Sequence, residues 1–413
     1  MTCVELSYSN PSPRMKYGAK LLFDFCIGVE HKWVDGVNDD LIVIKHGDIK
    51  LSSPIHPISL SQDEKAIAEG VQFPCNVESD CDLDYDPFAS AVFHAAQWKE
   101  ILLGDQLEKD EHNRFIGHEC SRPEVELLAL KLSELLGLDF NMNRYSFQPT
   151  IDIDVAFAFK GRSSLKSFLN SIRDLILLNW KRFALRIKVL NGKSVDPYDT
   201  YKWIDDLHKK YNLQSKAFIL FADKKKPYDV SLPESILENL IADLGDWDIH
   251  WHPSYHAMSS LQKKDVEVFS KEKSNFPCNS STVRAHFLRC DVRHWSQLVE
   301  LGVKEDYSLG YARFPGFRSG MCRPYPAYDL LKDEELPLTI YPVVVMDSSL
   351  KSYMNLSPEK AIEVVSKLNH EVRNVGGQMI TIFHNTSVSD FEEWKGWRKA
   401  YEEIVDLCSK PNS

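Results

Sequence analysis

The sequence lacks the features that mark nucleic-acid-binding and membrane-spanning proteins. Its longest run of basic residues is Lys224-Lys225-Lys226, and the formal net charge of the 413-residue chain is −11. Because phosphate binding requires a basic face, we expect no nucleic-acid partner. No apolar run is long enough to cross a bilayer, since polar and charged residues interrupt the longest candidate, around residues 175–190. We therefore also expect no membrane partner.

The sequence also has little that points to secretion. Its nine cysteines are scattered, odd in number and form no C-x-x-C pair. A large chain with this cysteine usage is expected to stay reduced. Residues 1–25 do not contain a basic segment followed by an apolar core and a small-residue cleavage site, as a secretory signal would. We predict a cytoplasmic protein.

Residues 1–145 are predicted to form an α+β accessory domain. Short apolar segments at 41–44 and 49–51 indicate strands. Asp86 followed by Pro87 is typical of a helix start, and Pro123–Leu136 is an amphipathic helix that Gly137 would end. No cluster of catalytic residue types occurs in this part.

Residues 146–413 show a different pattern, in which apolar strand-like runs alternate with helical periodicity. The predicted strands are 150–159, 216–222, 247–252, 283–288, 307–312, 339–346 and 379–384. Such alternation favours a parallel sheet, and about seven units suit a closed (β/α) barrel better than an open sheet. Leu165–Leu190 is predicted to be one long helix inserted after the first strand.

Two carboxylates on the first predicted strand suggest a functional site. In TIDIDVAFAF, Asp152 and Asp154 alternate with Ile151 and Ile153, so both acids point to one side of the strand. A buried carboxylate is unfavourable unless it is paired, hydrogen-bonded or bound to a metal. The alternative is a pair of exposed acids at a strand end, because D-x-D is a common pattern.

A histidine pair follows the third predicted strand, in WDIHWHPSYH. Pro253 favours the first turn of a helix, which would place His252 and His256 four residues apart on one helical face. Two imidazoles at this spacing are a metal-ligand arrangement. They could equally be two unrelated surface histidines. Both this pair and the acids fall at the carboxyl ends of strands, where barrel enzymes assemble their sites.

Three further polar residues lie on or after later strands. His384 ends the last strand, although a lone histidine there is more often structural than functional. Arg284 lies on the fourth strand and needs a carboxylate partner, which Asp152 could be. Arg318 follows the fifth strand.

Taken in order, these motifs resemble the polysaccharide deacetylase family with its NodB-homology domain. The resemblance rests on the acids of TIDID, on HPSYH, on Arg284 and on the final ITIFH, and it spans about residues 146–410. The phrases PYDTYKWIDDLHKKYNL, EDYSLGYARFPGFRSG and EEWKGWRKAYEE are similar to a bacterial branch in which an N-terminal domain of unknown role precedes the barrel. DPFASAVFHAAQWKE resembles part of that domain.

The resemblance implies a distorted (β/α)7 barrel of the NodB type that removes N- or O-acetyl groups from sugars with a divalent metal, usually zinc. Carried over, the metal ligands would be Asp154, His252 and His256. Asp152 would be the general base, which the family's arginine, here Arg284, orients. The general acid would be His384.

The chain departs from the common family pattern at two points. The family usually has adjacent acids (T-F-D-D), whereas one residue separates Asp152 from Asp154. The common R-x-P-Y is replaced by RAHF at 284–287, without the proline.

A carbohydrate substrate would need side chains that contact sugar. Tyr255, Arg318 and Trp397 are the candidate substrate-binding residues, although aromatic residues near the rim more often serve packing. Two alternatives stay open: a hydrolase of cyclic amides or other C–N bonds on the same barrel, and a carbohydrate-binding protein that has lost catalysis.

Overall fold

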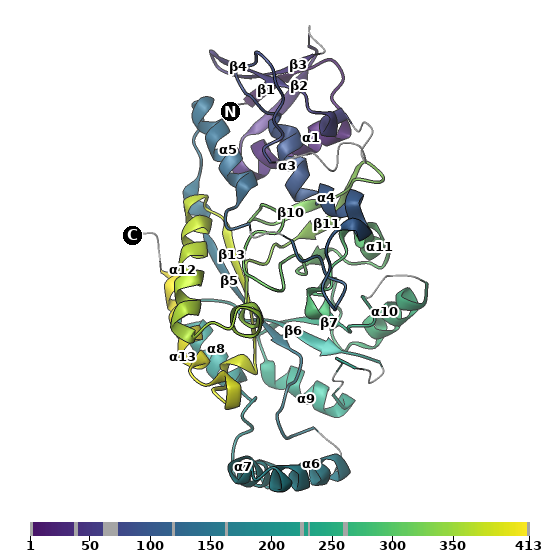
Figure 1. Cartoon of the computed structure of the whole chain (residues 1–413), viewed down its shortest axis with the longest axis vertical. Helices are drawn as coiled ribbons and strands as arrows, with labels where there is room; N and C mark the ends of the chain where they lie inside the picture. The colour runs from purple at the N-terminus through teal and green to yellow at the C-terminus, as the bar shows by residue number, and fades with distance from the viewer. Residues whose placement is uncertain are drawn as a thin grey trace.

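The computed structural model of the chain describes residues 3–36, 40–60, 73–117, 120–161, 164–223, 227–229, 232–258 and 263–410. Within these residues the strands form two sheets. One has four strands in the order β2-β1-β3-β4, and the other has nine in the order β10-β11-β9-β8-β7-β6-β5-β13-β12. Figure 1 shows the small sheet at one end of an elongated molecule and the large sheet in its middle.

The small sheet belongs to the first part of the chain. Its strands are β1 (Cys3–Ser7), β2 (Glu30–Val34), β3 (Leu41–His46) and β4 (Ile49–Pro54). The helices are α1 (Pro13–Ala19), η1 (Lys20–Ile27), η2 (Pro57–Leu60), α3 (Pro87–Ala95), α4 (Trp98–Leu103), η3 (Gly104–Gln106), α5 (Glu124–Leu135) and η4 (Met142–Arg144). The predicted helix starts are confirmed, since the Asp86 carboxylate accepts hydrogen bonds from the N–H groups of Phe88 and Ala89.

The large sheet contains every remaining strand. They are β5 (Ser146–Ile153), β6 (Lys216–Phe221), β7 (Asp248–Pro253), β8 (Thr282–Val283), β9 (Glu305–Asp306), β10 (Tyr325–Asp329), β11 (Glu334–Ile340), β12 (Val345–Met346) and β13 (Gln378–His384). The α-helices are α6 (Ser164–Ile176), α7 (Trp180–Leu190), α8 (Tyr201–Lys210), α9 (Glu234–Leu244), α10 (Lys263–Asn275), α11 (Trp295–Glu300), α12 (Pro358–Asn374) and α13 (Trp397–Ser409). Short helices are η5 (His286–Leu288), η6 (Val292–His294), η7 (Ser349–Tyr353), η8 (Ser387–Ser389) and η9 (Glu392–Trp394).

The order of the large sheet brings the ends of five consecutive strands together. Strands β5 to β9 lie side by side in chain order and run parallel, and β13 pairs with the free side of β5, also parallel. Among the described strands of the large sheet, β10 and β11 are the pair that runs antiparallel. In this register Asp152 stands opposite both Phe218 in β6 and His384 in β13. The predicted parallel α/β organisation is therefore confirmed.

Backbone hydrogen bonds outside the regular strand pairs link the segment between β11 and β12 to the residues after β9 and to β13. Between β11 and β12, the N–H of Val343 donates to the carbonyl of Leu309, after β9, at 2.9 Å. The N–H of the next residue, Val344, donates to the carbonyl of Ile380 in β13 at 3.0 Å. These bonds are not a regular ladder, so a closed seven-stranded barrel stays a prediction.

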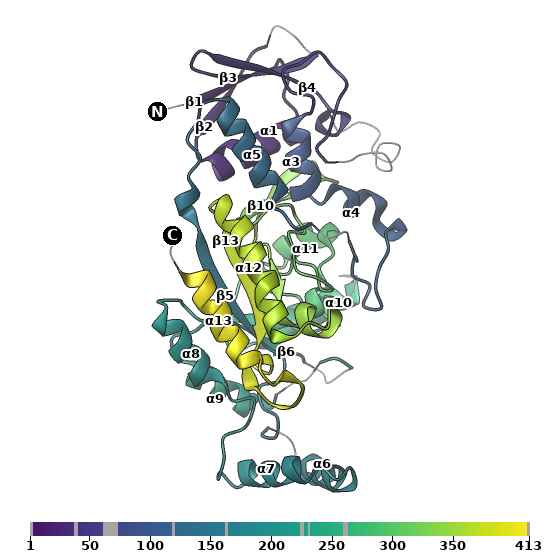
Figure 2. The ribbon, with the colours of Figure 1, turned by 60° about the vertical axis from the view of Figure 1, so that its left-hand side comes forward.

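The insertion after β5 is two helices rather than one. Leu178 adopts a positive φ of 56°, which an α-helix cannot contain, and α6 ends just before it. The chain then folds back, so that Arg186 of α7 meets Asp174 of α6 at 2.8 Å. The two helices form a hairpin that projects at the end of the molecule opposite the small sheet (Figures 1 and 2).

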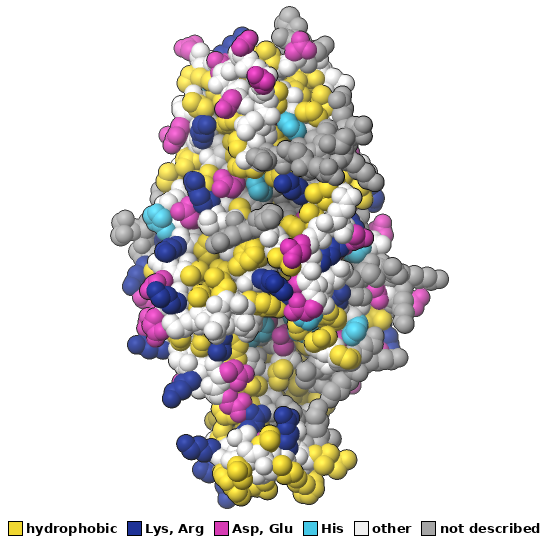
Figure 3. Space-filling model, in the orientation of Figure 1, with side chains coloured by type: hydrophobic (Ala, Val, Ile, Leu, Met, Phe, Trp, Pro, Cys, Tyr) yellow, Lys and Arg dark blue, Asp and Glu magenta, His cyan; other side chains and the backbone are white. Residues whose placement is uncertain are grey.

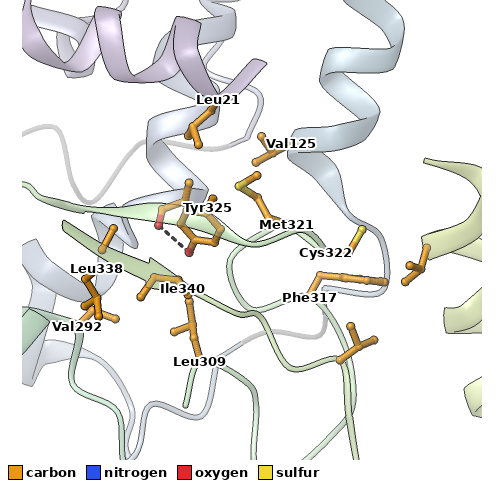
Figure 4. Close-up of a cluster of buried hydrophobic side chains, with 14 of the residues drawn as sticks. Leu21, Val125, Val292, Leu309, Phe317, Met321, Cys322, Tyr325, Leu338 and Ile340 are labelled. Carbon is orange, nitrogen blue, oxygen red and sulfur yellow. Dashed lines mark hydrogen bonds between the residues drawn. The ribbon is translucent and has the colours of Figure 1, made fainter. Parts of the chain in front are cut away.

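The two parts of the chain share one apolar core. Figure 4 shows Leu21 and Val125 of the first part close to Met321, Cys322 and Tyr325 of the second. All five side chains are buried. Since the buried residues continue across residue 145, the division into domains 1–145 and 146–413 stays a prediction.

Polar bonds reinforce this junction. The Arg318 guanidinium is buried and forms a bidentate ion pair with Glu100 of α4, with N···O distances of 2.9 and 2.7 Å. The hydroxyl of Tyr325 donates to the carbonyl of Ala95 at 3.0 Å. Removing one partner of a buried ion pair lowers the stability of a protein strongly, because the other charge stays buried without a partner.

We predict that Glu100→Ala destabilises the protein by about 3–5 kcal/mol, because it leaves the Arg318 charge buried without its partner. Differential scanning calorimetry should show a marked fall in unfolding temperature. The control is Glu403→Ala, which removes an exposed ion pair with Lys399 and should change stability by less than about 0.5 kcal/mol. Equal effects of the two substitutions would contradict a stabilising role of the junction pair.

Candidate metal centre

The site forms where the parallel strands end. Asp152 is near the carboxyl end of β5, and Asp154 follows one residue beyond the strand. Both acids point to the same side, as predicted, because both reach the Nε2 atom of His252 in β7, at 3.8 Å from Asp152 Oδ2 and 3.3 Å from Asp154 Oδ1. The carboxylates therefore converge on the rim where a neighbouring strand delivers an imidazole.

Three ligand atoms form a nearly equilateral triangle at this rim. Asp154 Oδ1 lies 3.3 Å from His252 Nε2 and 3.5 Å from His286 Nδ1, and the two nitrogens are 3.1 Å apart. In a tetrahedral zinc site with ligand bonds of about 2.0–2.1 Å, two ligand atoms lie about 3.3–3.4 Å apart. Within the described part of the chain, these residues are the group of Asp, Glu, His or Cys that could hold a metal ion.

The hydrogen bonds of both rings place a proton on the outer nitrogens, and the inner nitrogens face each other. His252 Nδ1 donates to the carbonyl of Arg284, and His286 Nε2 donates to the carbonyl of Tyr228 at 3.1 Å. A carbonyl can only accept, so each ring keeps its proton on the outer nitrogen. Burial lowers the pKa of His286 to about 4, which keeps that ring neutral.

Two inner ring nitrogens therefore face each other beside a carboxylate. Burial raises the pKa of Asp154, but the imidazoles of His286, His252 and His384 outweigh it and hold this pKa well below its usual range. Its Oδ1 atom is buried and accepts no hydrogen bond within the described residues. The three ligand atoms converge as a cation would require, and the donor set of one carboxylate and two imidazoles suits zinc.

The second carboxylate is held away from this triangle by an arginine. Arg284, directly after β8, is fully buried and contacts Asp152 Oδ1 through Nη1 at 2.5 Å. Its Nε also donates to the carbonyl of Tyr307, and its guanidinium lies 4.0 Å from the centre of the Phe218 ring. The predicted contact between Arg284 and Asp152 is thus present. The other oxygen of Asp152, Oδ2, remains directed toward His252.

His384 stands on the opposite side of Asp154. Its Nδ1 lies 2.8 Å from Oδ1 of the buried Asp347, and its Nε2 lies 3.4 Å from Asp154 Oδ2. Burial alone would lower the pKa of His384, but the charge of Asp347 and the bond to Asp154 raise it well above its ordinary value. His384 is therefore a protonated imidazole that points its Nε2–H toward the cluster.

The predicted helical face shared by His252 and His256 is wrong for this structure. β7 extends to Pro253, so residues 254–258 form a turn and the two histidines do not share a helical face. His256 instead lies 4.0 Å from Asp229, and its place beside Asp154 and His252 is taken by His286.

Two of the three predicted substrate-binding residues are used for packing. Arg318 is committed to Glu100 at the junction, and Trp397, at the start of α13, is buried in the main core. Neither side chain is available to a substrate.

Tyr255 lies in an aromatic cluster beside the candidate metal ligands. Its ring contacts the rings of Tyr228 and Phe287. The carbonyl of Tyr228 accepts a hydrogen bond from His286 Nε2, and Phe287 follows His286 in the sequence. The first part of the chain reaches this cluster too, because His112 Nδ1 lies 3.2 Å from the Tyr255 hydroxyl. The sequence had given no sign that the accessory part approaches the site.

Sequence reasoning missed His286 and Asp347. His286 was visible as the second residue after Arg284, in the position where the family pattern has proline, but its role depends on a short turn rather than a strand. Asp347 follows β12 and its carboxylate also accepts the backbone N–H of His384 at 2.7 Å. An acid directly after an apolar strand run was the signal that could have found it.

Solved structures include loose likenesses to this chain. No family model and no curated protein matches the chain. A Mycobacterium smegmatis protein assigned as a polysaccharide deacetylase matches at a TM-score of 0.41 and 18% identity, over 65% of this chain and 85% of that one. A Bordetella bronchiseptica protein, assigned as a polysaccharide deacetylase involved in O-antigen biosynthesis, matches at a TM-score of 0.32 and 14% identity, over 66% and 93%.

Both proteins carry the name of the family that the sequence motifs resemble. The likenesses are too loose to say more about this chain than its own residues do.

We predict that His286→Ala abolishes tight zinc binding, whereas His256→Ala retains it. Of these two histidines, only His286 has a ring nitrogen in the triangle, and loss of one of three protein ligands removes much of the affinity. Competition with a fluorescent zinc chelator, together with elemental analysis of the purified variants, would measure both. If His256→Ala loses zinc and His286→Ala retains it, the prediction is contradicted and His252 pairs with His256 as a metal ligand.

Proposed function

We propose that this chain is a metal-dependent hydrolase that removes an acetyl or other acyl group from a carbohydrate. The observation that carries the proposal is the convergence of Asp154, His252 and His286 on one point, with a second carboxylate and a protonated imidazole beside them. Four of these five residues, all except His286, are those to which the resemblance to polysaccharide deacetylases assigns metal binding and proton transfer.

The proposed metal ligands are Asp154, His252 and His286, and we propose zinc as the ion. Three protein ligands leave a position open, as catalytic zinc sites require. A bound divalent ion would lower the pKa of a water molecule and polarise the acyl carbonyl. Every other task in the reaction falls to side chains of the protein.

Asp152 is proposed as the general base. Its Oδ1 is occupied by Arg284, whereas its Oδ2 faces the cluster, 3.8 Å from His252 Nε2. This division keeps the carboxylate out of the triangle but within reach of a water held there. Arg284 acts through Asp152 and is a positioning residue.

His384 is proposed as the general acid. Its Nδ1–H is engaged by Asp347, so the proton that can leave is the one on Nε2, on the side of Asp154. Transfer of this proton to the nitrogen or oxygen of the departing sugar would complete the cleavage. The Asp347 carboxylate both orients the ring and supports its charge.

The carbohydrate class of the substrate rests on the resemblance and on the aromatic cluster of Tyr228, Tyr255 and Phe287. The Tyr228 side chain is exposed and lies against Tyr255, so it offers a face on which a sugar could stack. Acetate release from chitooligosaccharides and from nucleotide-linked N-acetyl sugars tests the class. Ring opening or ammonia release in place of acetate would favour the C–N hydrolase. A cytoplasmic location stays a prediction that cell fractionation would test.

Asp152→Asn and His384→Ala should each lower the rate of acyl hydrolysis about 10²–10⁴-fold while zinc content stays unchanged, because each removes proton transfer and no metal ligand. The control is Asp206→Asn, which changes an exposed acid on α8 and should leave the rate as it is. If Asp152→Asn keeps full activity with bound zinc, Asp152 is not the base.

Asp347→Asn should shift the alkaline limb of the kcat/KM profile to lower pH by about one unit or more. The raised pKa keeps His384 protonated at neutral pH, and the acid form is lost as the pH rises through that pKa. Removing the Asp347 charge lowers the pKa of His384, so the loss begins earlier. An unchanged alkaline limb would show that His384 does not supply the proton.

A further inference from the structure

The hairpin formed by α6 and α7 exposes an unusual amount of apolar surface. Of the nineteen large hydrophobic side chains that are exposed in the described part of the chain, ten lie in this hairpin. They are Leu165, Phe168, Leu169, Ile172, Ile176, Leu177, Leu178, Trp180, Ile187 and Leu190. We call these ten residues the hairpin face.

The residues of the hairpin face are spaced along the sequence as on one side of a helix. On α6 its members recur every three or four residues, from Leu165 to Ile176, and on α7 Trp180, Ile187 and Leu190 keep a similar period. A stripe of this kind normally faces a core. Here it faces outward: Leu165, Ile176 and Trp180 are 68%, 74% and 61% exposed.

The inner side of the hairpin is polar on α6 and mixed on α7, where Val189 packs against Ala158 and Phe159. Ser167, Ser171 and Asp174 of α6 are buried, and so is Arg186 of α7. Arg186 bonds Asp174 at 2.8 Å and lies 4.6 Å from the centre of the Phe159 ring. The first contact joins the two helices, and the second attaches the hairpin to the body of the protein, so the apolar stripe stays on its outside.

The charge of the hairpin is opposite to that of the rest of the chain. Residues 164–193 contain one acid, Asp174, in a chain whose net charge is −11. The basic residues of this segment are Lys166, Arg173, Lys181, Arg182, Arg186, Lys188 and Lys193. Four of them, Arg173, Lys181, Lys188 and Lys193, are exposed. Figure 3 shows hydrophobic side chains gathered at this end of the molecule, with Lys and Arg next to them.

We propose that the α6–α7 hairpin binds the surface of a membrane that contains anionic lipids. Amphipathic helices with Leu, Phe and Trp on one face and Lys or Arg on the other lie in the interface between headgroups and acyl chains, and basic residues draw them to anionic lipid. The hairpin lies on the surface and does not cross it: no helix in the described residues is long and apolar enough to span a membrane. A second copy of the chain fits less well, because two basic hairpins would repel each other.

The position of the hairpin also determines which side of the protein would face the membrane. β5 ends at Ile153 and α6 begins at Ser164, so the hairpin leaves the large sheet at the rim that carries Asp152 and Asp154. A membrane bound by the hairpin would lie on that side of the protein. This interaction revises the expectation of no membrane partner and is independent of the proposed chemistry.

The test is co-flotation of the full-length protein with vesicles of phosphatidylcholine, with or without one third phosphatidylglycerol. We expect flotation with the anionic vesicles and at least about tenfold less with the neutral ones or in high salt. The triple variant Leu165→Ser, Phe168→Ser, Ile176→Ser should lose flotation, and Lys181→Gln with Lys188→Gln should weaken it. The control is Leu331→Ser, which changes a side chain 67% exposed between β10 and β11 and should float like the wild type.

Zinc content and unfolding temperature of each variant show that it is folded. Light scattering measures the oligomeric state in parallel. A wild-type protein that does not float with anionic vesicles overturns the proposal, and a dimer that the triple variant dissociates would then identify a second copy as the occupant. Flotation that the triple variant retains would also overturn it.

Discussion

Two imidazoles whose inner nitrogens face each other beside a carboxylate are the constraint on which the site depends. His252 and His286 each donate a proton from the outer nitrogen to a backbone carbonyl, so the inner nitrogens, 3.1 Å apart, are the ones directed at Asp154. A cation between these three groups would bind all of them at once. The carbonyls of Arg284 and Tyr228 belong to the backbone, and the fold itself therefore prepares the ligands.

The surrounding charges follow from this centre. Asp152 and Asp154 occupy the same side of β5, yet Arg284 neutralises only the first and leaves the second to the imidazoles. On the far side, Asp347 holds His384 protonated. Each acid thus has its own cationic or metal-binding partner, which is how a strand end can bury two carboxylates without placing two like charges together.

The sequence was sufficient where regular structure placed the residues. Strand alternation predicted that Asp152 and Asp154 share a side, and the parallel pattern brought Arg284 and His384 to the same rim. The sequence was insufficient where a turn determined the position of a residue. The prediction for His252 and His256 assumed a helix, but β7 continues through Pro253. His286 follows a two-residue strand and precedes Phe287 at a positive φ of 63°, a geometry that no periodicity reveals. The exposure of the apolar face of α6 and α7 could not be predicted either, because an amphipathic pattern does not show whether another part of the protein covers that face.

The most direct test of the central claim is the position of the ion. Anomalous diffraction at the zinc edge from crystals grown with zinc should give a peak bonded to Asp154 Oδ1, His252 Nε2 and His286 Nδ1, at about 2.0–2.2 Å from each. Asp152 should then remain on Arg284, outside the coordination sphere. A crystal without a peak among these three atoms, or with one on His256 in place of His286, would contradict the account.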